Sequence, residues 1–268
     1  MKKILFFPIY LLPCWALAQK GLDEMIATEK SFAAYAVANN TRDAFLKFMD
    51  TAAIMFDKGN PVNGYQLWLH KKPSTGILNW GPRFAEVSAS GDFGYTCGSW
   101  TYQPTSLQDS ILASGYFITV WQQIKGVGWK FIFDGGTEQA PQLADWKVIK
   151  QKIIKEKGNR KYLRKAEIDF TQLAANNAPA AYRKYLSRQS VVCREVFAAT
   201  ASVKEQTILL SALPSQIIYQ QLGFGIAPTN DLAYTYGNTV VENKKEFYVH
   251  IWRHEKQGWK LALCMLRY

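Results

Sequence analysis

The sequence has few of the residues from which disulfide frameworks and metal sites are built. It contains four cysteines and three histidines. Cys14 lies in an N-terminal apolar segment, so Cys97, Cys193 and Cys264 are left for the body of the chain. This odd, sparse set excludes a small scaffold held together by disulfides. We expect three buried free thiols, and a Cys193–Cys264 pair is the alternative.

The histidines do not form a metal-binding pattern. His250 and His254 are spaced as H-x-x-x-H, which on a helix would place two zinc ligands on one face. They lie in a segment with strand periodicity, where four residues span roughly 13 Å, so they do not share a metal. The chain also lacks a nucleophile elbow, a metal-binding cysteine pair and a phosphate loop. We therefore expect no metal and no cofactor.

Long apolar runs are absent except at the N-terminus. Lys2 and Lys3 precede an apolar run from Ile4 to Leu17, and the run ends in a small-x-small exit at Ala18. This order is typical of a secretory signal peptide. The run is shorter than the roughly 20 residues that a permanent membrane span needs. We expect export to the periplasm or the extracellular space, cleavage after Ala18 and no stable membrane insertion.

Acidic residues are fewer than basic ones, 21 against 32, which gives a formal charge of +11. Much of the excess lies between residues 147 and 165. A basic run of this kind indicates either a nucleic-acid-binding stripe or a solvated linker and helix face. For an exported protein the second interpretation is favoured, and we expect no nucleic-acid partner.

The body of the chain contains one pattern twice. The matching segments are 29–32 and 167–170, 91–98 and 230–237, and 116–130 and 247–260. Their offsets fall between 130 and 139 residues and keep one order, which indicates a tandem duplication. We divide the chain into a signal peptide (1–18), a first domain (19–141), a basic linker and helix (142–160) and a second, divergent domain (161–268).

Each copy changes its periodicity from helix to strand. Helical spacing covers Leu22–Ala36 and resumes after a break at Asn39-Asn40-Thr41, whereas period two begins near Phe84. Lys125-Gly126-Val127-Gly128 predicts a hairpin turn between the last two strands. The second copy opens with a helix over about Arg160–Asn177 and ends in strands. Helices followed by an antiparallel sheet predict an α+β fold.

Several motifs of the first copy resemble the SnoaL-like branch of the nuclear transport factor 2-like superfamily, in particular its exported bacterial members of unknown function. They are Pro61–Gly64 with Trp68, Trp80–Pro82, Ser90–Thr96 and Trp129–Gly136. The resemblance covers nearly all of the first copy, and in the second mainly the opening helix and the final strands.

This resemblance implies two tandem cones, each with N-terminal helices packed on a curved antiparallel sheet around a concave pocket. Relatives include ketosteroid isomerases, polyketide cyclases, dehydratases and binding modules without chemistry, so the fold does not fix the function. The closest subgroup carries no agreed catalytic residues that would map onto this chain.

Two acids distinguish the first copy from the second. Asp57 corresponds to Arg194, and Asp134 corresponds to Cys264. An isomerase-type site needs a carboxylate as general base and a tyrosine or protonated acid beside it. Asp57, Asp134 and Tyr116 are therefore the candidate catalytic residues. The alternative is structural: Asp57 caps the turn that follows it, and Asp134 holds a loop at the next two glycines.

Large flat side chains are expected to form the walls of a pocket for an apolar molecule. We expect Trp80, Trp100, Tyr116 and Asp134 to contact such a ligand. Trp100 corresponds to Thr239, so the fold does not require it.

Other residues repeat in both copies and therefore indicate packing. Trp121 and Trp129 recur as Trp252 and Trp259. Glu29 and Glu167 fall at equivalent places on apolar helix faces, and we interpret them as buried acids with hydrogen-bond partners. A role in the pocket is the alternative for these two acids.

Two functions follow from these features. We favour a binding protein whose first copy holds a small apolar molecule while the second serves as its packing partner, which predicts a monomer in which the copies pair as a pseudo-dimer. The alternative is an isomerase, cyclase or dehydratase that uses a pocket aspartate as acid and base.

Overall fold

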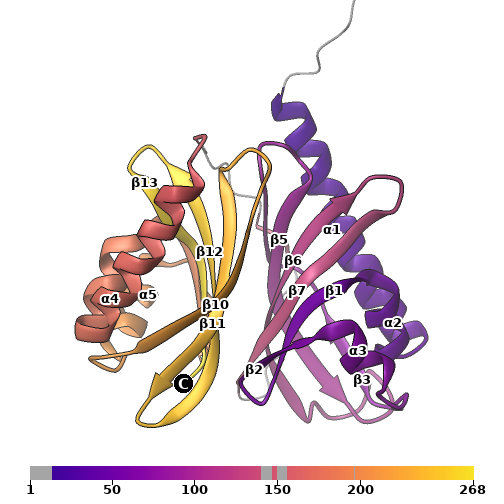
Figure 1. The fold of residues 1–268 in the computed structure, drawn as a ribbon. Coiled ribbons are helices and arrows are strands. Elements are labelled where there is room, and N and C mark those ends of the chain that lie inside the picture. Colours follow the sequence, from indigo (N-terminus) through magenta and orange to yellow (C-terminus); the bar gives the residue numbers. More distant parts are fainter. Residues whose placement is uncertain (1–13, 140–146, 150–155, 196) are drawn as a thin grey trace, which may run out of the picture.

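The computed structural model describes residues 14–139, 147–149, 156–195 and 197–268. The two copies lie side by side, each as a curved sheet with its helices on the side away from the other copy (Figure 1). The predicted signal segment up to residue 13 and most of the predicted linker 142–160 lie outside the described residues. Residues 14–18, which the predicted cleavage would remove, belong to the first helix.

The first copy opens with α1 (Cys14–Ala38), α2 (Thr41–Phe48) and α3 (Gly64–Leu69). Its strands are β1 (Met49–Asp57), β2 (Asn60–Asn63), β3 (Ile77–Trp80), β4 (Phe84–Val87), β5 (Phe93–Gln103), β6 (Ala113–Ile124) and β7 (Gly128–Gln139). The sheet order is β2-β1-β7-β6-β5-β3, with β4 also paired to β5. β1 runs parallel to β7, and the other pairs are antiparallel.

The second copy contains α4 (Arg160–Tyr185) and α5 (Val203–Ser211). Its strands are β8 (Leu186–Arg194), β9 (Phe197–Thr200), β10 (Ile218–Ile226), β11 (Leu232–Val241), β12 (Lys244–Glu255) and β13 (Gly258–Leu266). The sheet order is β10-β11-β12-β13-β8-β9, and β8 runs parallel to β13 as β1 does to β7. The predicted α+β class and its tandem repetition are confirmed.

One asparagine starts the second helical segment in both copies. The Asn40 side chain accepts a hydrogen bond from the Asp43 backbone N–H, 2.9 Å away, and so caps α2. In α4, Asn177 leaves helical geometry (φ −156°, ψ 87°) and accepts from the Ala180 N–H at 3.0 Å. The same cap therefore divides α1 from α2 in the first copy and produces the kink of α4 in the second.

Each copy also buries one glutamate under its helix. Glu29 accepts hydrogen bonds from Trp80 Nε1 (2.6 Å), Thr96 Oγ1 (2.5 Å) and Trp121 Nε1 (3.1 Å). The equivalent acid, Glu167, accepts from the repeated partners, Thr235 Oγ1 at 2.8 Å and Trp252 Nε1 at 2.7 Å. These acids fasten the first helix of each copy to its sheet.

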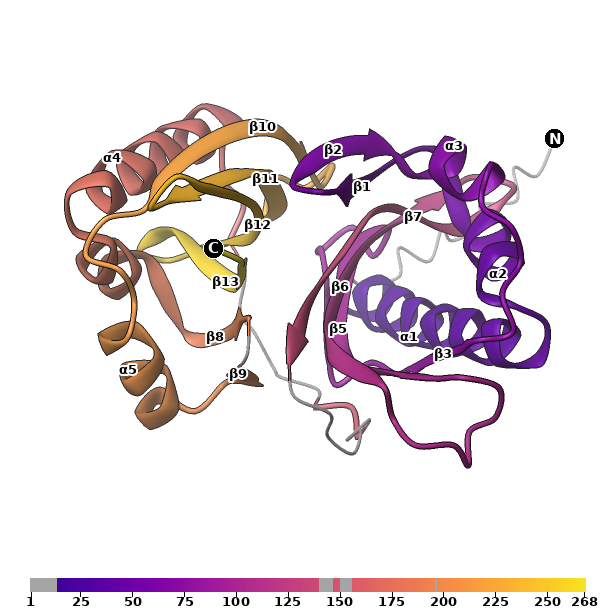
Figure 2. The same cartoon turned by 90° about the horizontal axis from the view of Figure 1, so that it is seen from below.

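The two sheets face each other across an apolar interface, seen from below in Figure 2. Phe56 of β1 stacks on Phe247 of β12, with ring centroids 4.7 Å apart. The cluster that fills the interface also contains Phe93, Cys97, Ile118, Val120, Phe133, Val191, Cys193, Leu232, Tyr234, Val249, Ile251, Leu263 and Met265. The second copy thus covers a sheet face that would otherwise be apolar and exposed.

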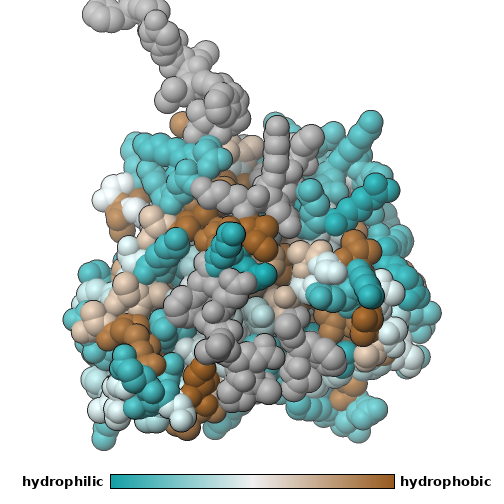
Figure 3. All heavy atoms as spheres, turned by 180° about the vertical axis from the view of Figure 1, so that it is seen from behind, coloured by the Kyte–Doolittle hydropathy of each residue, from teal (hydrophilic) through white to brown (hydrophobic). Residues whose placement is uncertain are grey.

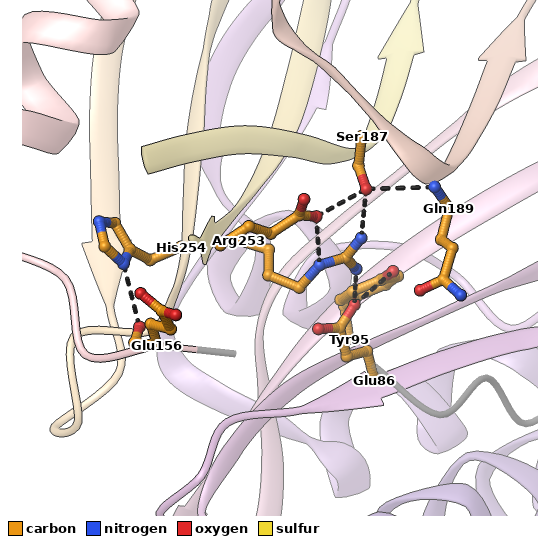
Figure 4. A network of polar contacts seen from close by, with 8 residues as sticks. Glu86, Tyr95, Glu156, Ser187, Gln189, Arg253 and His254 are labelled. Atoms are coloured by element: carbon orange, nitrogen blue, oxygen red, sulfur yellow. Dashed lines mark hydrogen bonds and ion pairs between the residues drawn. The ribbon is translucent and has the colours of Figure 1, made fainter. Parts of the chain in front are cut away.

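A buried ion pair crosses this interface (Figure 4). The fully buried Arg253 guanidinium lies 2.6 Å from Glu86 Oε2 of the first copy and also binds Ser187 Oγ (2.7 Å) and Glu255 Oε1 (3.0 Å). Tyr95 O–H donates to the same Glu86 oxygen at 3.3 Å. These contacts tie β12 of the second copy to β4 and β5 of the first.

The alternative cysteine pairing is wrong. In the β8–β13 ladder Cys193 is the partner of Met265, whereas Cys264 is the partner of Val192. Since ladder partners share a face and successive residues alternate, Cys193 and Cys264 point to opposite faces of the sheet. Cys97, Cys193 and Cys264 are free and buried.

The outer surface is mixed in character. On the face opposite that of Figure 1, hydrophilic side chains alternate with scattered hydrophobic ones (Figure 3). Within the described ranges, no helix is long and apolar enough to cross a membrane.

Candidate functional site

The first copy contains a cavity of about 210 Å³ between its helices and the inner face of its sheet. Its walls are mostly aromatic, and the polar groups are few. The lining residues are Phe32, Phe45, Leu78, Trp80, Trp100, Phe117, Asp134, Gly135, Gly136, Thr137, Glu138 and Arg267. A concave apolar site with a few polar groups is the usual form of a small-molecule site.

The two tryptophans of this wall are fixed by the sheet. Trp80 of β3 and Trp100 of β5 are ladder partners, so their side chains lie on one face. The Trp80 indole N–H donates to Glu29, which holds the ring in place. A Cβ at Gly115 would lie 2.8 Å from Trp100 Nε1 and 1.8 Å from the Thr137 carbonyl oxygen, so only glycine at 115 leaves room for the indole.

Asp134 supplies one of the two carboxyl groups that line the cavity; the other belongs to Glu138, which is exposed. Asp134 lies on β7 opposite Thr119, whose hydroxyl donates to Asp134 Oδ2 at 2.8 Å. Burial raises the pKa of Asp134 to about 8, the hydrogen bond from Thr119 opposes this shift and the nearby Glu29 adds to it. Burial also raises the pKa of Glu29, against the hydrogen bonds that it accepts from Thr96, Trp80 and Trp121. Asp134 is therefore largely protonated near neutral pH, with one oxygen engaged by Thr119 and the other left to donate to a ligand.

The equivalent space of the second copy is closed. Only about 10 Å³ remains there, beside Tyr182 and Cys264. Ladder register makes Tyr219 the counterpart of Trp80, because Tyr219 pairs with Thr239 as Trp80 pairs with Trp100. The Tyr219 and Tyr182 hydroxyls hydrogen-bond at 2.7 Å across the space. Leu209 and Leu210 of α5 pack into the same core.

The Thr119–Asp134 pair of the first copy has also been replaced. In register, Thr119 and Asp134 correspond to His250 and Cys264. His250 is fully buried, with its Nδ1 3.6 Å from Glu167 Oε1 and its ring against Phe170. In the described residues, no group of three or more histidine, cysteine or acidic side chains is arranged to hold a metal ion.

Three of the predicted ligand contacts, Trp80, Trp100 and Asp134, lie together in the cavity wall. Tyr116 does not. On β6, Phe117 belongs to the inner core of the first copy, whereas Tyr116 and Ile118 pack in the interface between the copies. The placement of Tyr116 in the pocket is therefore corrected: its side chain lies on the opposite face of the sheet.

Asp57 also lies away from the cavity. It is exposed at the end of β1 and pairs with Asn60 across a tight turn, where Lys58 and Gly59 have φ values of 50° and 74°. This position fits the turn interpretation and excludes Asp57 from the acid and base chemistry of the cavity. The loop interpretation of Asp134 is wrong, because β7 continues through the two glycines to Gln139.

The sequence interpretation missed part of the wall. Phe32 and Phe45 carry the helical periodicity of the first copy, which indicated only a core. Arg267 comes from the end of the second copy, where its Nη1 donates to the Gly136 carbonyl oxygen at 3.2 Å and its Nη2 lies 3.2 Å from Glu195 Oε1. No local motif reveals a residue brought in from the other copy.

Neither a protein-family model nor a curated protein matches the chain. The solved structures named below each cover less than half of the chain. A nuclear transport factor 2-like protein of unknown function from Shewanella oneidensis MR-1 is 19% identical, and the match covers 42% of this chain and 96% of that one with a TM-score of 0.34.

Two further solved structures show the range of proteins that match. A candidate ketosteroid isomerase from Parabacteroides distasonis is 17% identical, with 42% of this chain and 86% of that chain covered and a TM-score of 0.32. The association domain of CaMKII from C. elegans is 11% identical, with 44% and 96% covered and a TM-score of 0.35.

Both copies have the same architecture, with helices packed on one face of a curved, mostly antiparallel sheet. The family resemblance in the sequence predicted this cone-shaped unit and its repetition. Among the described residues of the second copy, the equivalent space leaves only about 10 Å³, so the candidate site lies in the first copy.

Proposed function

We propose that the protein is exported and binds a small, mainly apolar molecule in the cavity of its first copy, with the second copy as packing partner. The observation that carries the proposal is the contrast between the copies. The first keeps an aromatic cavity of about 210 Å³ with the Asp134 carboxyl group in its wall, and the second has filled the same place with tyrosine and leucine side chains.

The size and polarity of the cavity limit the ligand. An apolar cavity of roughly 150 Å³ accommodates benzene, so this cavity suits a molecule of one or two rings. Trp80, Trp100 and Phe117 offer flat surfaces for ring contacts. A protonated Asp134 offers a hydrogen-bond donor to an oxygen acceptor of the ligand, such as a carbonyl or hydroxyl group.

Calorimetric titration with 2-naphthol, a two-ring probe with one hydroxyl, tests this proposal. We expect saturable binding at one site and at least about tenfold weaker binding for Trp100→Thr, which introduces the residue of the second copy. Asp134→Asn should weaken binding less, because its amide still donates. Asp57→Asn is the matched control and should bind as the wild type does. Equal affinity for wild type and Trp100→Thr would refute the site.

A second function, acid and base catalysis, is favoured by one observation. Asp134 lies in an apolar wall with a pKa raised by burial to about 8, which suits proton transfer near neutral pH. The probe is a β,γ-unsaturated cyclohexenone in deuterated buffer, followed by NMR. Deuterium incorporation accelerated by the wild type and lost in Asp134→Asn would support catalysis. Incorporation at the rate of buffer alone would reject it and leave binding intact.

The same proposal includes a monomeric protein. The sheet face of the first copy is occupied by the second, through Phe56, Phe93 and Phe133 on one side and Tyr234 and Phe247 on the other. Light scattering should therefore give the mass of one chain. A dimer that persists on dilution would contradict this part of the proposal.

A further inference from the structure

Two cysteines meet at the centre of the interface between the copies. Cys97 lies on β5 of the first copy and Cys193 on β8 of the second, and their Sγ atoms are 3.6 Å apart. Both side chains are fully buried in the apolar cluster between the sheets. These residues are 96 positions apart in sequence, so only the packing of one copy on the other brings them together.

We propose that Cys97 and Cys193 form a disulfide that covalently joins the two copies. The oxidant is a disulfide of low molecular weight, such as glutathione disulfide, or that of a thiol oxidoreductase. In two exchange steps each cysteine loses its proton, one Cys97–Cys193 S–S bond forms, the S–S bond of the oxidant breaks and two thiols leave. The bond needs an oxidising compartment, so its formation in the cell rests on the proposed export.

Cys264 does not compete for either partner. It lies on the other face of the second sheet, in the core with Tyr182 and Leu209, and it is 1% exposed. Cys97 and Cys193 share a cluster that does not include it. The geometry therefore predicts one disulfide and one free thiol.

The bond forms during folding, while the two copies come together and the interface is still open to an oxidant. In the folded chain Cys97 and Cys193 are both out of reach of an external oxidant. Burial raises the pKa of Cys97 well above its usual range, and the neighbouring Cys193 adds to the shift, so the reactive thiolate is scarce there. Folding under oxidising conditions should therefore give the disulfide, whereas a protein that folds with reduced thiols should stay reduced for long periods.

The bond would close a loop of about one hundred residues, and a cross-link that closes a long loop restricts the unfolded chain more than one that closes a short loop. It would also hold β5, which carries Trp100 in the cavity wall, against the second copy. The consequence is a first copy that does not separate from its packing partner.

Oxidative refolding of the full chain tests the inference. The denatured, reduced protein is refolded with a glutathione redox pair, the remaining thiols are alkylated, and the digest is mapped by mass spectrometry. We expect a Cys97–Cys193 linked peptide and alkylated Cys264. Cys264→Ala is the matched control and should give the same linkage, and Cys193→Ala should give none. A linkage to Cys264, or alkylated Cys97 and Cys193 after oxidative refolding, would overturn the proposal.

The melting temperatures of the oxidised and the reduced wild type give a second test, in which the two samples have the same sequence. We expect the oxidised wild type to melt at least about 5 °C above the reduced protein, and the Cys193→Ala variant to show no such difference. An oxidised protein that melts at or below the reduced one would contradict the proposed fit of the bond. Neither readout depends on ligand binding or on export, so the fate of the proposed function is decided separately.

Discussion

At the scale of single residues, the Asp134 carboxyl makes stability depend on pH. Its pKa is raised to about 8 in the folded state, against about 3.9 unfolded. Between these values the folded state binds the extra proton, so the stabilisation is complete below about pH 4 and is lost as pH rises through 8. Asp134→Asn keeps the shape and removes this titration.

We therefore expect Asp134→Asn to gain stability relative to the wild type as pH rises from about 5 to about 9. Urea unfolding at three pH values in this window measures the difference. Parallel pH profiles of the two proteins would show that Asp134 is not held protonated.

Glu29 is a second residue whose partners predict its behaviour. Its Oε1 accepts a hydrogen bond from Trp80, and its Oε2 accepts from Thr96 and Trp121. A glutamine in its place would point its NH₂ group, a hydrogen-bond donor, at one of these donor groups. We expect Glu29→Gln to cost about 1–3 kcal/mol in unfolding free energy and to weaken 2-naphthol binding, since Trp80 lines the cavity. Glu24→Gln, partly exposed on the same helix, should change neither by more than about 0.5 kcal/mol.

At the scale of elements, the repeated asparagine cap should contribute equally to both copies. Asn40→Ala and Asn177→Ala each remove the acceptor for one N–H at a helix start. We expect a loss of about 1 kcal/mol for each, measured by urea unfolding. Asn39→Ala, next to the cap, is the control and should lose less than about 0.5 kcal/mol. A loss confined to Asn40→Ala would mean that the kink of α4 does not depend on Asn177.

The elements themselves were predictable because packing residues repeat with the fold. The helical periods, the break at Asn40 and the final strands gave the α+β class, and the repetition of Trp121 as Trp252 located the sheet core. The faces of the strands were not predictable. β6 is apolar on both sides, since one face packs under the helices and the other against the second copy, so alternation did not show that Tyr116 points away from the cavity.

Contacts between strands that are distant in the sequence could not be predicted for a related reason. Register sets which residues share a face of a sheet. The ladder partner of Cys264 is Val192, and Cys193, one residue further along β8, points to the opposite face. Arg267 likewise reaches the cavity only because the second copy docks on the first. Such residues are determined by the assembled chain, and local periodicity carries no information about them.

At the scale of the whole molecule, the Arg253–Glu86 pair couples the folding of the two copies. Arg253 is fully buried, and its Nη1 lies 2.6 Å from Glu86 Oε2 across the interface. Arg253→Met leaves the Glu86 carboxylate without its guanidinium in an apolar surrounding, and removing one partner of a buried pair costs about 3–5 kcal/mol. Replacing both by methionine removes the unbalanced charge.

We therefore expect the Glu86→Met, Arg253→Met double variant to be more stable than Arg253→Met alone, by at least about 1 kcal/mol, in a double-mutant cycle. Scanning calorimetry of the wild type should show one transition, because neither sheet keeps its apolar face covered when the other unfolds. Additive losses in the cycle together with two resolved transitions would mean that the copies fold independently. The second copy would then be an appended domain, and the cavity of the first would have to keep its shape without it.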